Sequence, residues 1–199
     1  MTDPVEVWLR DALAHPAGPS SDFDLNPGIR PPSDKPLRPA AVLVPVWLRP
    51  EGAGLILTKR ASHLKHHPGQ IAFPGGKVDA TDASAEAAAL RETQEEIGLD
   101  PARVRILGSL PVHETVTGFA VTPFVGVIDS AFDPVPEVGE VDEVFTVPLR
   151  YALSPARFVI EGRQWMGVRR RYYAAPYGPY YIWGATARIL RGLAERVAP

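Results

Sequence analysis

The segment 75–99 reads GGKVDATDASAEAAALRETQEEIGL and carries the strongest structural signal of the chain. A run rich in Ala and Glu predicts a helix over residues 84–97. Asp82 or Ser84 is expected to be its N-cap, and Gly98 is expected to end it. The preceding FPGG at 73–76 is expected to be a rigid loop that brings bare backbone amides close to a ligand.

Three glutamates of this helix gather within a narrow arc: Glu92, Glu95 and Glu96. Leu90, Thr93 and Ile97 fall on the other side of the helical wheel. Like charges at these spacings repel, and a divalent cation would turn the repulsion into attraction. Oxygen-only ligands suit Mg²⁺ or Mn²⁺. The alternative is that the glutamates form only a solvated face; the glycine loop before the helix favours the metal site.

Apolar runs on both sides of this helix predict a strand-rich domain. Strands are expected at residues 41–48, 55–60, 104–110, 121–128 and 143–149. Residues 157–181 are interpreted as two further strands around an Arg-rich turn, and residues 183–197 as an amphipathic helix. The fold class is therefore α+β.

The first 37 residues differ in composition from the rest. A short helix is expected at 4–14, followed by a proline-rich arm, because 22 of the 199 residues are proline and many lie between 16 and 39. The expected division is an N-terminal helix and arm over 1–37 and a main domain over 38–199. The arm either covers a partner subunit, as in a homodimer, or wraps its own sheet.

Composition excludes several function classes. The formal net charge is −2, which does not suit a generally basic protein that coats nucleic acid. Cysteine is absent, so thiol catalysis and thiolate metal sites are excluded. No apolar run reaches membrane-spanning length, and the acidic start does not suit a signal peptide. The expectation is a cytoplasmic protein with no membrane or nucleic-acid partner.

The glutamate segment resembles the Nudix box, Gly-x5-Glu-x7-Arg-Glu-U-x-Glu-Glu-x-Gly-U, where U is apolar. Gly76 opens the pattern, and residues 91–99 match its second half with Thr93 in one apolar slot. The first half of the segment departs from the pattern. One extra residue lies between Gly76 and Arg91, and the first glutamate of the pattern is absent, with Asp82 as the nearest acid. The resemblance implies a Nudix α/β/α sandwich, with a mixed sheet between helices.

The upstream stretch LTKRASHLKHHPGQIAFPGG, residues 57–76, is similar to the signature of the coenzyme A pyrophosphatase subfamily. That signature reads Leu-Leu-Thr-x-Arg-[Ser/Ala]-x3-Arg-x3-Gly-x3-Phe-Pro-Gly-Gly. Ile56 and Lys65 depart from it, and Lys65 gives up bidentate contact with phosphate. The resemblance implies that substrate is bound by Arg60, Lys65, Gly75 and Gly76.

The resemblance also implies a mechanism. Glu92, Glu95 and Glu96 would hold Mg²⁺ or Mn²⁺ at the diphosphate of a nucleotide substrate, where the metal activates water. Arg91 would orient a glutamate through a salt bridge. Glu140 is the first candidate for the general base, ahead of Glu143 and Glu114. The expected products from coenzyme A or acyl-CoA are 3′,5′-ADP and (acyl-)4′-phosphopantetheine.

Alternatives stay open at this point. The chain could hydrolyse another nucleoside diphosphate derivative, such as ADP-ribose, a dinucleotide or a nucleoside triphosphate, or it could be a non-catalytic ligand-binding module on the same scaffold. A group of aromatic residues near the C-terminus either contacts adenine or pantetheine, or packs under the terminal helix: Tyr172, Tyr173, Tyr177, Tyr180, Tyr181 and Trp183.

Overall fold

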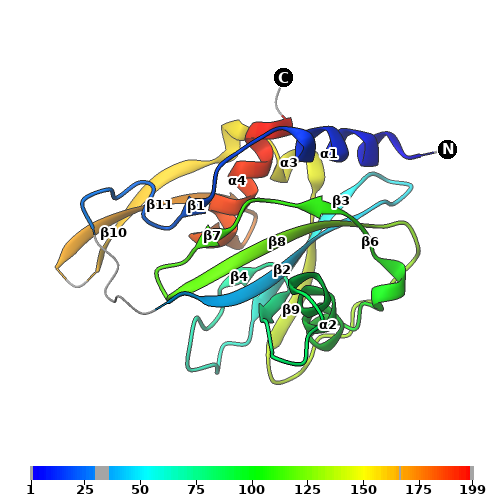
Figure 1. Cartoon of the computed structure of the whole chain (residues 1–199), viewed down its shortest axis with the longest axis horizontal. Helices are drawn as coiled ribbons and strands as arrows, with labels where there is room; N and C mark the ends of the chain where they lie inside the picture. Colours follow the sequence, from blue (N-terminus) through cyan, green and yellow to red (C-terminus); the bar gives the residue numbers. More distant parts are fainter. Residues whose placement is uncertain (1, 30–35, 166, 198–199) are drawn as a thin grey trace.

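A computed structural model describes residues 2–29, 36–165 and 167–197. At its centre, strand β2 (Arg38–Trp47) runs parallel to β8 (Phe119–Ile128) over its whole length and antiparallel to β3 (Gly54–Arg60) at its end. β9 (Val141–Pro148) continues the sheet beyond β3. The almost uninterrupted apolar sequence of β2 fits a strand that is buried on both faces. Figure 1 shows these strands crossing the middle of the molecule.

Short strands complete this sheet. They are β1 (Ser20–Ser21), β4 (Ile71–Ala72), β5 (Gly75–Lys77), β6 (Arg105–Ser109) and β7 (His113–Glu114). Within the described residues the sheet has nine strands, some parallel and some antiparallel, and its main strand order is β1-β7-β8-β2-β3-β4. Three strands lie outside this order: β5 pairs with β2, β6 pairs with β8, and β9 pairs with β3. The pairing of β5 with β2 places the glycine loop at a central strand.

A second, antiparallel sheet corrects the interpretation of residues 157–181. It has three strands instead of two: β10 (Val159–Trp165), β11 (Val168–Tyr177) and β12 (Tyr180–Trp183). The arginines at 169–171 belong to β11 and are not part of a turn. Gly167 and Gly178, both at positive φ, precede β11 and separate β11 from β12. Turns at these glycines need the left-handed region that an Arg residue avoids.

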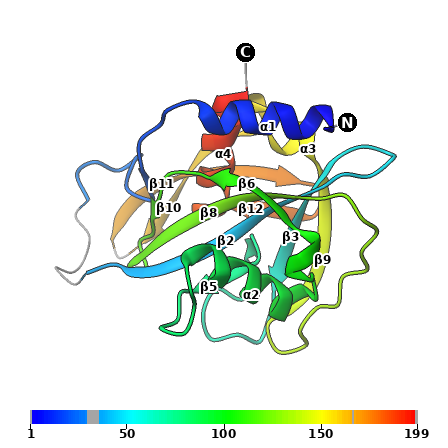
Figure 2. The ribbon, with the colours of Figure 1, turned by 45° about the vertical axis from the view of Figure 1, so that its right-hand side comes forward.

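Helices cover both faces of the large sheet. α1 (Pro4–Ala14) and α4 (Ala185–Val197) share a hydrophobic core with one face, and α2 (Ala85–Ile97) packs on the other, as Figures 1 and 2 show. Three single turns complete the helical structure: η1 (Pro101–Arg103), α3 (Leu149–Ala152) and η2 (Pro155–Arg157). The α+β sandwich with a mixed sheet between helices is confirmed. None of the helices in the described ranges is long and apolar enough to cross a lipid bilayer.

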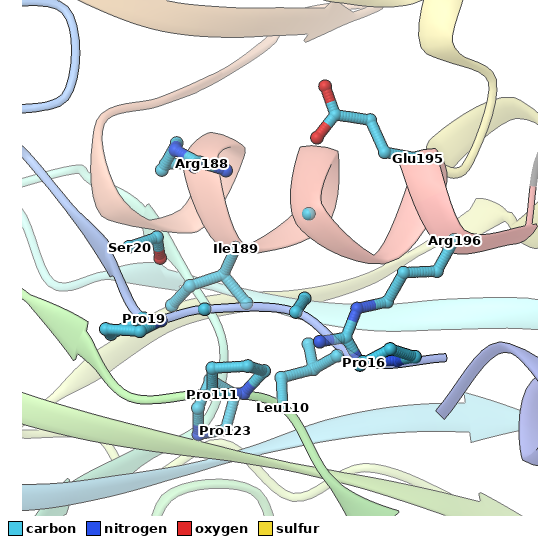
Figure 3. A pocket seen from close by; sticks show the side chains of 13 residues that line it. Pro16, Pro19, Ser20, Leu110, Pro111, Pro123, Arg188, Ile189, Glu195 and Arg196 are labelled. Carbon is cyan, nitrogen blue, oxygen red and sulfur yellow. The ribbon is translucent and has the colours of Figure 1, made fainter. Parts of the chain in front are cut away.

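The N-terminal segment packs against the rest of the chain. Leu9 and Ala12 of α1 are buried in the same core as α4. After α1 the chain runs extended, and β1 pairs in parallel with β7. Residues 16–21 therefore form an extended wrap along the sheet, while residues 30–35 of the arm lie outside the described residues. A cavity of about 410 Å³ lies between this wrap, α4 and the prolines of the sheet (Figure 3).

Candidate active site

The helix α2 has defined caps at both ends. The Ser84 side chain accepts a hydrogen bond from the Ala87 N–H at 3.1 Å, so Ser84 is the N-cap of the two candidates. Gly98 ends the helix at φ 72°, and its N–H donates to the Gln94 carbonyl. Thr93 fits an apolar position because its hydroxyl donates to the Ala89 carbonyl, four residues earlier. These caps fix the two ends of the helix, and its buried residues Ala88, Ala89 and Ile97 pack toward the sheet.

Glu96 is the buried carboxylate of the site. It is 4% exposed, and one of its oxygens accepts the Gly75 N–H at 3.1 Å. Burial raises its pKa to about 7, and the nearby charges of Glu140 and Glu92 act in the same direction. The Gly75 hydrogen bond and the charge of Arg60 oppose this shift. At neutral pH this carboxyl is therefore partly protonated unless a cation lies beside it.

Glu92 lies directly against the glycine loop. A Cβ atom on Gly76 would overlap the Glu92 carboxylate, so only glycine allows this approach. Burial raises the pKa of Glu92, and the charges of Glu95 and Glu140 add to the shift, while Arg91 opposes it. Gly75 is needed for a separate reason: it has φ 144° and would clash with the β2 backbone if it carried a side chain.

Arg91, in the middle of α2, connects acidic side chains of this helix with one from the preceding loop. Its Nε and Nη2 donate to the two oxygens of Asp82, at 2.9 and 3.0 Å. Its Nη1 donates to Glu92 at 3.1 Å and to Glu95 at 3.0 Å. The expected salt bridge from Arg91 to a glutamate is present. Asp82, named above as a candidate N-cap, instead binds this guanidinium, which holds the Asp82 pKa below its usual range.

The structure brings together only part of the predicted ligand set. The charges of Glu140 and Glu92 act on Glu96, and the charges of Glu95 and Glu140 act on Glu92. Glu95, with 59% of its side chain exposed, is turned to Arg91. In the ranges that the structure describes, no three carboxylates or imidazoles already form a metal-ligand group. The carboxylate oxygens of Glu92 and Glu96 nevertheless fit Mg²⁺ or Mn²⁺, because Arg91 binds one oxygen of Glu92 and the Gly75 N–H binds one oxygen of Glu96.

The three candidates for the general base lie in different places. The Glu140 carbonyl accepts the Ala61 N–H at 2.8 Å, so this exposed residue sits beside the end of β3 and near Glu92 and Glu96. Glu143 accepts the Tyr180 hydroxyl and lines a different hollow. Glu114 lies on β7, and β8 and β2 separate it from the glycine loop. Geometry therefore favours Glu140.

The predicted substrate-binding residues also separate into two groups. Arg60 is half-buried and acts electrostatically on Glu96. Its backbone is fixed to the loop, because Gly69 N–H donates to the Arg60 carbonyl and Arg60 N–H donates to Gln70. Gly75 and Gly76 face the glutamates as described. Lys65 is exposed, and no hydrogen bond or ion pair joins it to the site in the described part of the chain.

Comparisons with known proteins identify the family of the chain. The NUDIX domain profile matches residues 37–168, more than half of the chain. A relative from Enterobacter sp. (strain 638), named "Uncharacterized Nudix hydrolase NudL", is 49% identical over 160 residues, which cover 80% of this chain and 83% of the relative. A relative of the same name from Salmonella newport (strain SL254) is 48% identical with the same coverage. The crystal structure of a Nudix hydrolase from M. smegmatis, RenU, aligns at 22% identity over 58% of this chain and 73% of that chain, with a TM-score of 0.49.

Proposed function

Because the chain belongs to the Nudix hydrolase family, we propose that it is a divalent-metal-dependent pyrophosphatase of coenzyme A or acyl-CoA. It would cleave the diphosphate to give 3′,5′-ADP and (acyl-)4′-phosphopantetheine. The substrate is a small nucleotide, and the metal is Mg²⁺ or Mn²⁺.

The observation that carries this proposal is the position of the loop at residues 57–76. Three of its signature positions surround the same two carboxylates: Arg60 lies near Glu96, Gly75 donates to Glu96, and Gly76 contacts Glu92. A loop that only connected β3 to α2 would not need a cation and two glycines at the acidic face. Its residues therefore support a role in binding the substrate beside the metal ligands.

Each residue has a role in the proposed reaction. Glu92 and Glu96 would hold the cation, and Glu95 would join them by leaving Arg91, which keeps its bonds to Asp82. A cation held by these residues would supply positive charge at the diphosphate and would lower the pKa of an attacking water. Glu140 accepts the proton of that water. The backbone at Gly75 and Gly76 allows the phosphates to approach closely, and Arg60 adds positive charge.

The direct test is hydrolysis of coenzyme A by the purified chain with Mg²⁺ or Mn²⁺, with the products resolved by chromatography. ADP-ribose, NADH and dNTPs are assayed in parallel. Release of 3′,5′-ADP at a higher kcat/KM than for any other substrate supports the proposal. If the chain cleaves another diphosphate but not coenzyme A, the metal site is retained and coenzyme A is rejected as the substrate. Binding without cleavage of any substrate would favour a non-catalytic module.

Replacement of Glu92 by Gln is expected to lower kcat by several orders of magnitude, because the shape is kept and a ligand charge is lost. The fold should stay intact, which circular dichroism checks. Near-normal turnover would reject the assignment of Glu92 as a metal ligand.

Glu140→Gln and Glu143→Gln distinguish the two nearest base candidates. Glu140→Gln is expected to lower kcat at saturating metal by about 10²–10⁴-fold. Glu143→Gln, which keeps a partner for the Tyr180 hydroxyl, should leave kcat near that of the wild type. Near-normal turnover of Glu140→Gln would exclude Glu140 as the base.

A further inference from the structure

A cavity of about 800 Å³ lies beyond the end of β3, next to the loop at residues 67–71. Its walls come from that loop, from β9 and from the second sheet, including Tyr180, Tyr181 and Trp183 of β12. Lys59, His67 and Arg163 add basic side chains. None of these residues belongs to the set around Glu92 and Glu96.

Aromatic rings line one side of the cavity and are held in place. Trp183 is half-buried and packs edge-to-face on Tyr172, with ring centroids 5.2 Å apart. Tyr181 lies beside Trp183, and its hydroxyl donates to Glu161 at 2.6 Å. Rings fixed in this way offer a flat apolar surface on which a nucleobase can stack.

The cations of the cavity are available for a ligand. In the described part of the chain, no ion pair joins Lys59 or Arg163 to a carboxylate. The carboxylate that shares the cavity, Glu143, accepts the Tyr180 hydroxyl and lies across the strand pair from Lys59, which also acts on Asp142. Lys59 and Arg163 together bring two positive charges to the cavity, which suits a phosphate group, and Arg can donate two parallel hydrogen bonds to it.

The cavity and the glutamate site meet at the end of β3. Lys59 and Arg60 are consecutive residues of this strand, and consecutive side chains of a strand point to opposite faces. Arg60 acts on Glu96, on the α2 side, while Lys59 lines the cavity opposite Glu143. A ligand that extends around this strand end would have one part at each site.

We propose that this cavity binds the 3′-phosphoadenosine part of the substrate, with the adenine stacked on Trp183 and the 3′-phosphate held by Lys59 and Arg163. The inference rests on the proposed function, because it assigns the third phosphate of coenzyme A while the diphosphate lies at the glutamates. It also makes Lys59, Arg163 and Trp183 residues that determine substrate specificity.

The test compares coenzyme A with 3′-dephospho-coenzyme A as substrates of the full chain. Lys59→Ala and Arg163→Ala are each expected to lower kcat/KM for coenzyme A by about tenfold or more, since each removes a charge-assisted contact. Neither should change kcat/KM for the dephospho compound. Arg169→Ala, at an exposed arginine of the neighbouring strand, is the matched control and should change neither value.

Trp183→Leu is expected to raise KM for both substrates while kcat stays within about twofold of the wild type, because the adenine is common to both. Its melting temperature must be measured, because Trp183 also packs on Tyr172. Titration of 3′,5′-ADP into the Glu92→Gln chain gives a second measurement that needs no turnover. Arg163→Ala should weaken that binding by about tenfold or more.

The two proposals fail in different ways. Suppose that the wild type cleaves coenzyme A but that Lys59→Ala and Arg163→Ala leave the ratio of kcat/KM for coenzyme A to kcat/KM for 3′-dephospho-coenzyme A unchanged. The inference is then overturned and the proposed function stands. If the wild type does not cleave coenzyme A, the proposed function fails. The cavity assignment is then judged on 3′,5′-ADP binding alone, and a Kd unaffected by Arg163→Ala rejects it.

Discussion

Arg91 shows how one side chain can organise several acids. It binds both oxygens of Asp82 and also contacts Glu92 and Glu95, so the position of Glu92 depends on an aspartate ten residues earlier. Residues that orient metal ligands commonly affect activity without touching the metal. Asp82 is therefore a positioning residue of this site.

Asp82→Asn is expected to lower kcat by roughly 10–100-fold, because Arg91 loses its strongest partner and no longer holds Glu92 in place. Asp79→Asn serves as the control, since Asp79 is 63% exposed and lies 3.7 Å from the Arg91 guanidinium. The measurement is steady-state kinetics at saturating metal. Equal effects of the two variants would contradict the role of Asp82.

Gly76→Ala is expected to displace the Glu92 carboxylate and weaken the affinity for Mn²⁺, because the added methyl group occupies the space of that carboxylate. Gly28→Ala, where a Cβ meets nothing within 4 Å, is the control. Calorimetric titration with Mn²⁺ measures the effect. Unchanged affinity in Gly76→Ala would show that Glu92 does not bind the metal from this position.

The sequence predicts the helix that carries the glutamates, because spacing and residue type are local properties. It predicts a loop with bare backbone amides at 73–76, whereas Gly75 and Gly76 belong to β5, which pairs with β2, and the Gly75 N–H binds Glu96. It does not predict that Asp82 binds Arg91, because the extra residue in the loop hides the correspondence with the pattern. It also does not predict that Glu95 turns toward Arg91 or that Glu96 is buried. Those outcomes depend on the contact of α2 with β5, which is a tertiary feature.

At the level of elements, α1 is fixed to the sheet by one buried acid. Glu6 is 5% exposed and accepts hydrogen bonds from Arg105 of β6 at 2.7 Å and from Arg10 at 2.9 Å. These bonds hold the pKa of Glu6 below its usual value. The resulting stabilisation is present above the pKa of an unfolded glutamate and is lost as the pH falls through the folded pKa.

The melting temperature should therefore fall as the pH is lowered below about 4, and part of this fall should come from Glu6. Glu6→Gln should lower the melting temperature at pH 7 and narrow the difference between pH 7 and pH 3. Thermal unfolding of both proteins at the two pH values measures this. If the melting temperatures of the wild type and of Glu6→Gln fall by the same amount between pH 7 and pH 3, a contribution from Glu6 is excluded.

The bounds of long elements with a clear pattern of apolar residues were predicted within a few residues, including those of α1, α2 and the long strands of the large sheet. The helix predicted at 183–197 was also close, since α4 spans Ala185–Val197. The strand β12 was not predicted, because it has only four residues and its aromatic sequence suits either a strand or the start of a helix. Packing against the rest of the fold decides between these. Tyr180 stacks on Phe145 of β9, a contact between distant parts of the chain.

For the whole molecule, the extended wrap is tied down by a buried histidine. His113 is fully buried; its Nδ1 lies 2.9 Å from the Ser20 hydroxyl and its Nε2 lies 3.2 Å from Asp22. Asp22 also accepts the Val116 N–H at 2.9 Å. Both polar partners of the imidazole come from the N-terminal segment.

His113→Ala is expected to destabilise the fold by about 2–4 kcal/mol, because it leaves a cavity and deprives Ser20 and Asp22 of a partner. The melting temperature should fall by several degrees. His66→Ala, at an exposed loop position, is the control and should have little effect. A melting temperature equal to that of the control would mean that His113 does not secure the wrap.

The pairing of β1 with β7 also has a consequence for solution behaviour. Strand edges with free N–H and C=O groups are templates on which other chains can add, and β1 covers such an edge on β7. Proteolytic removal of the wrap would leave the backbone carbonyls of Val112 and Glu114 unpaired, and the side chain of Val112 is itself apolar and exposed. The trimmed protein would then self-associate at concentrations at which the full chain stays dispersed, and light scattering during digestion would follow that change.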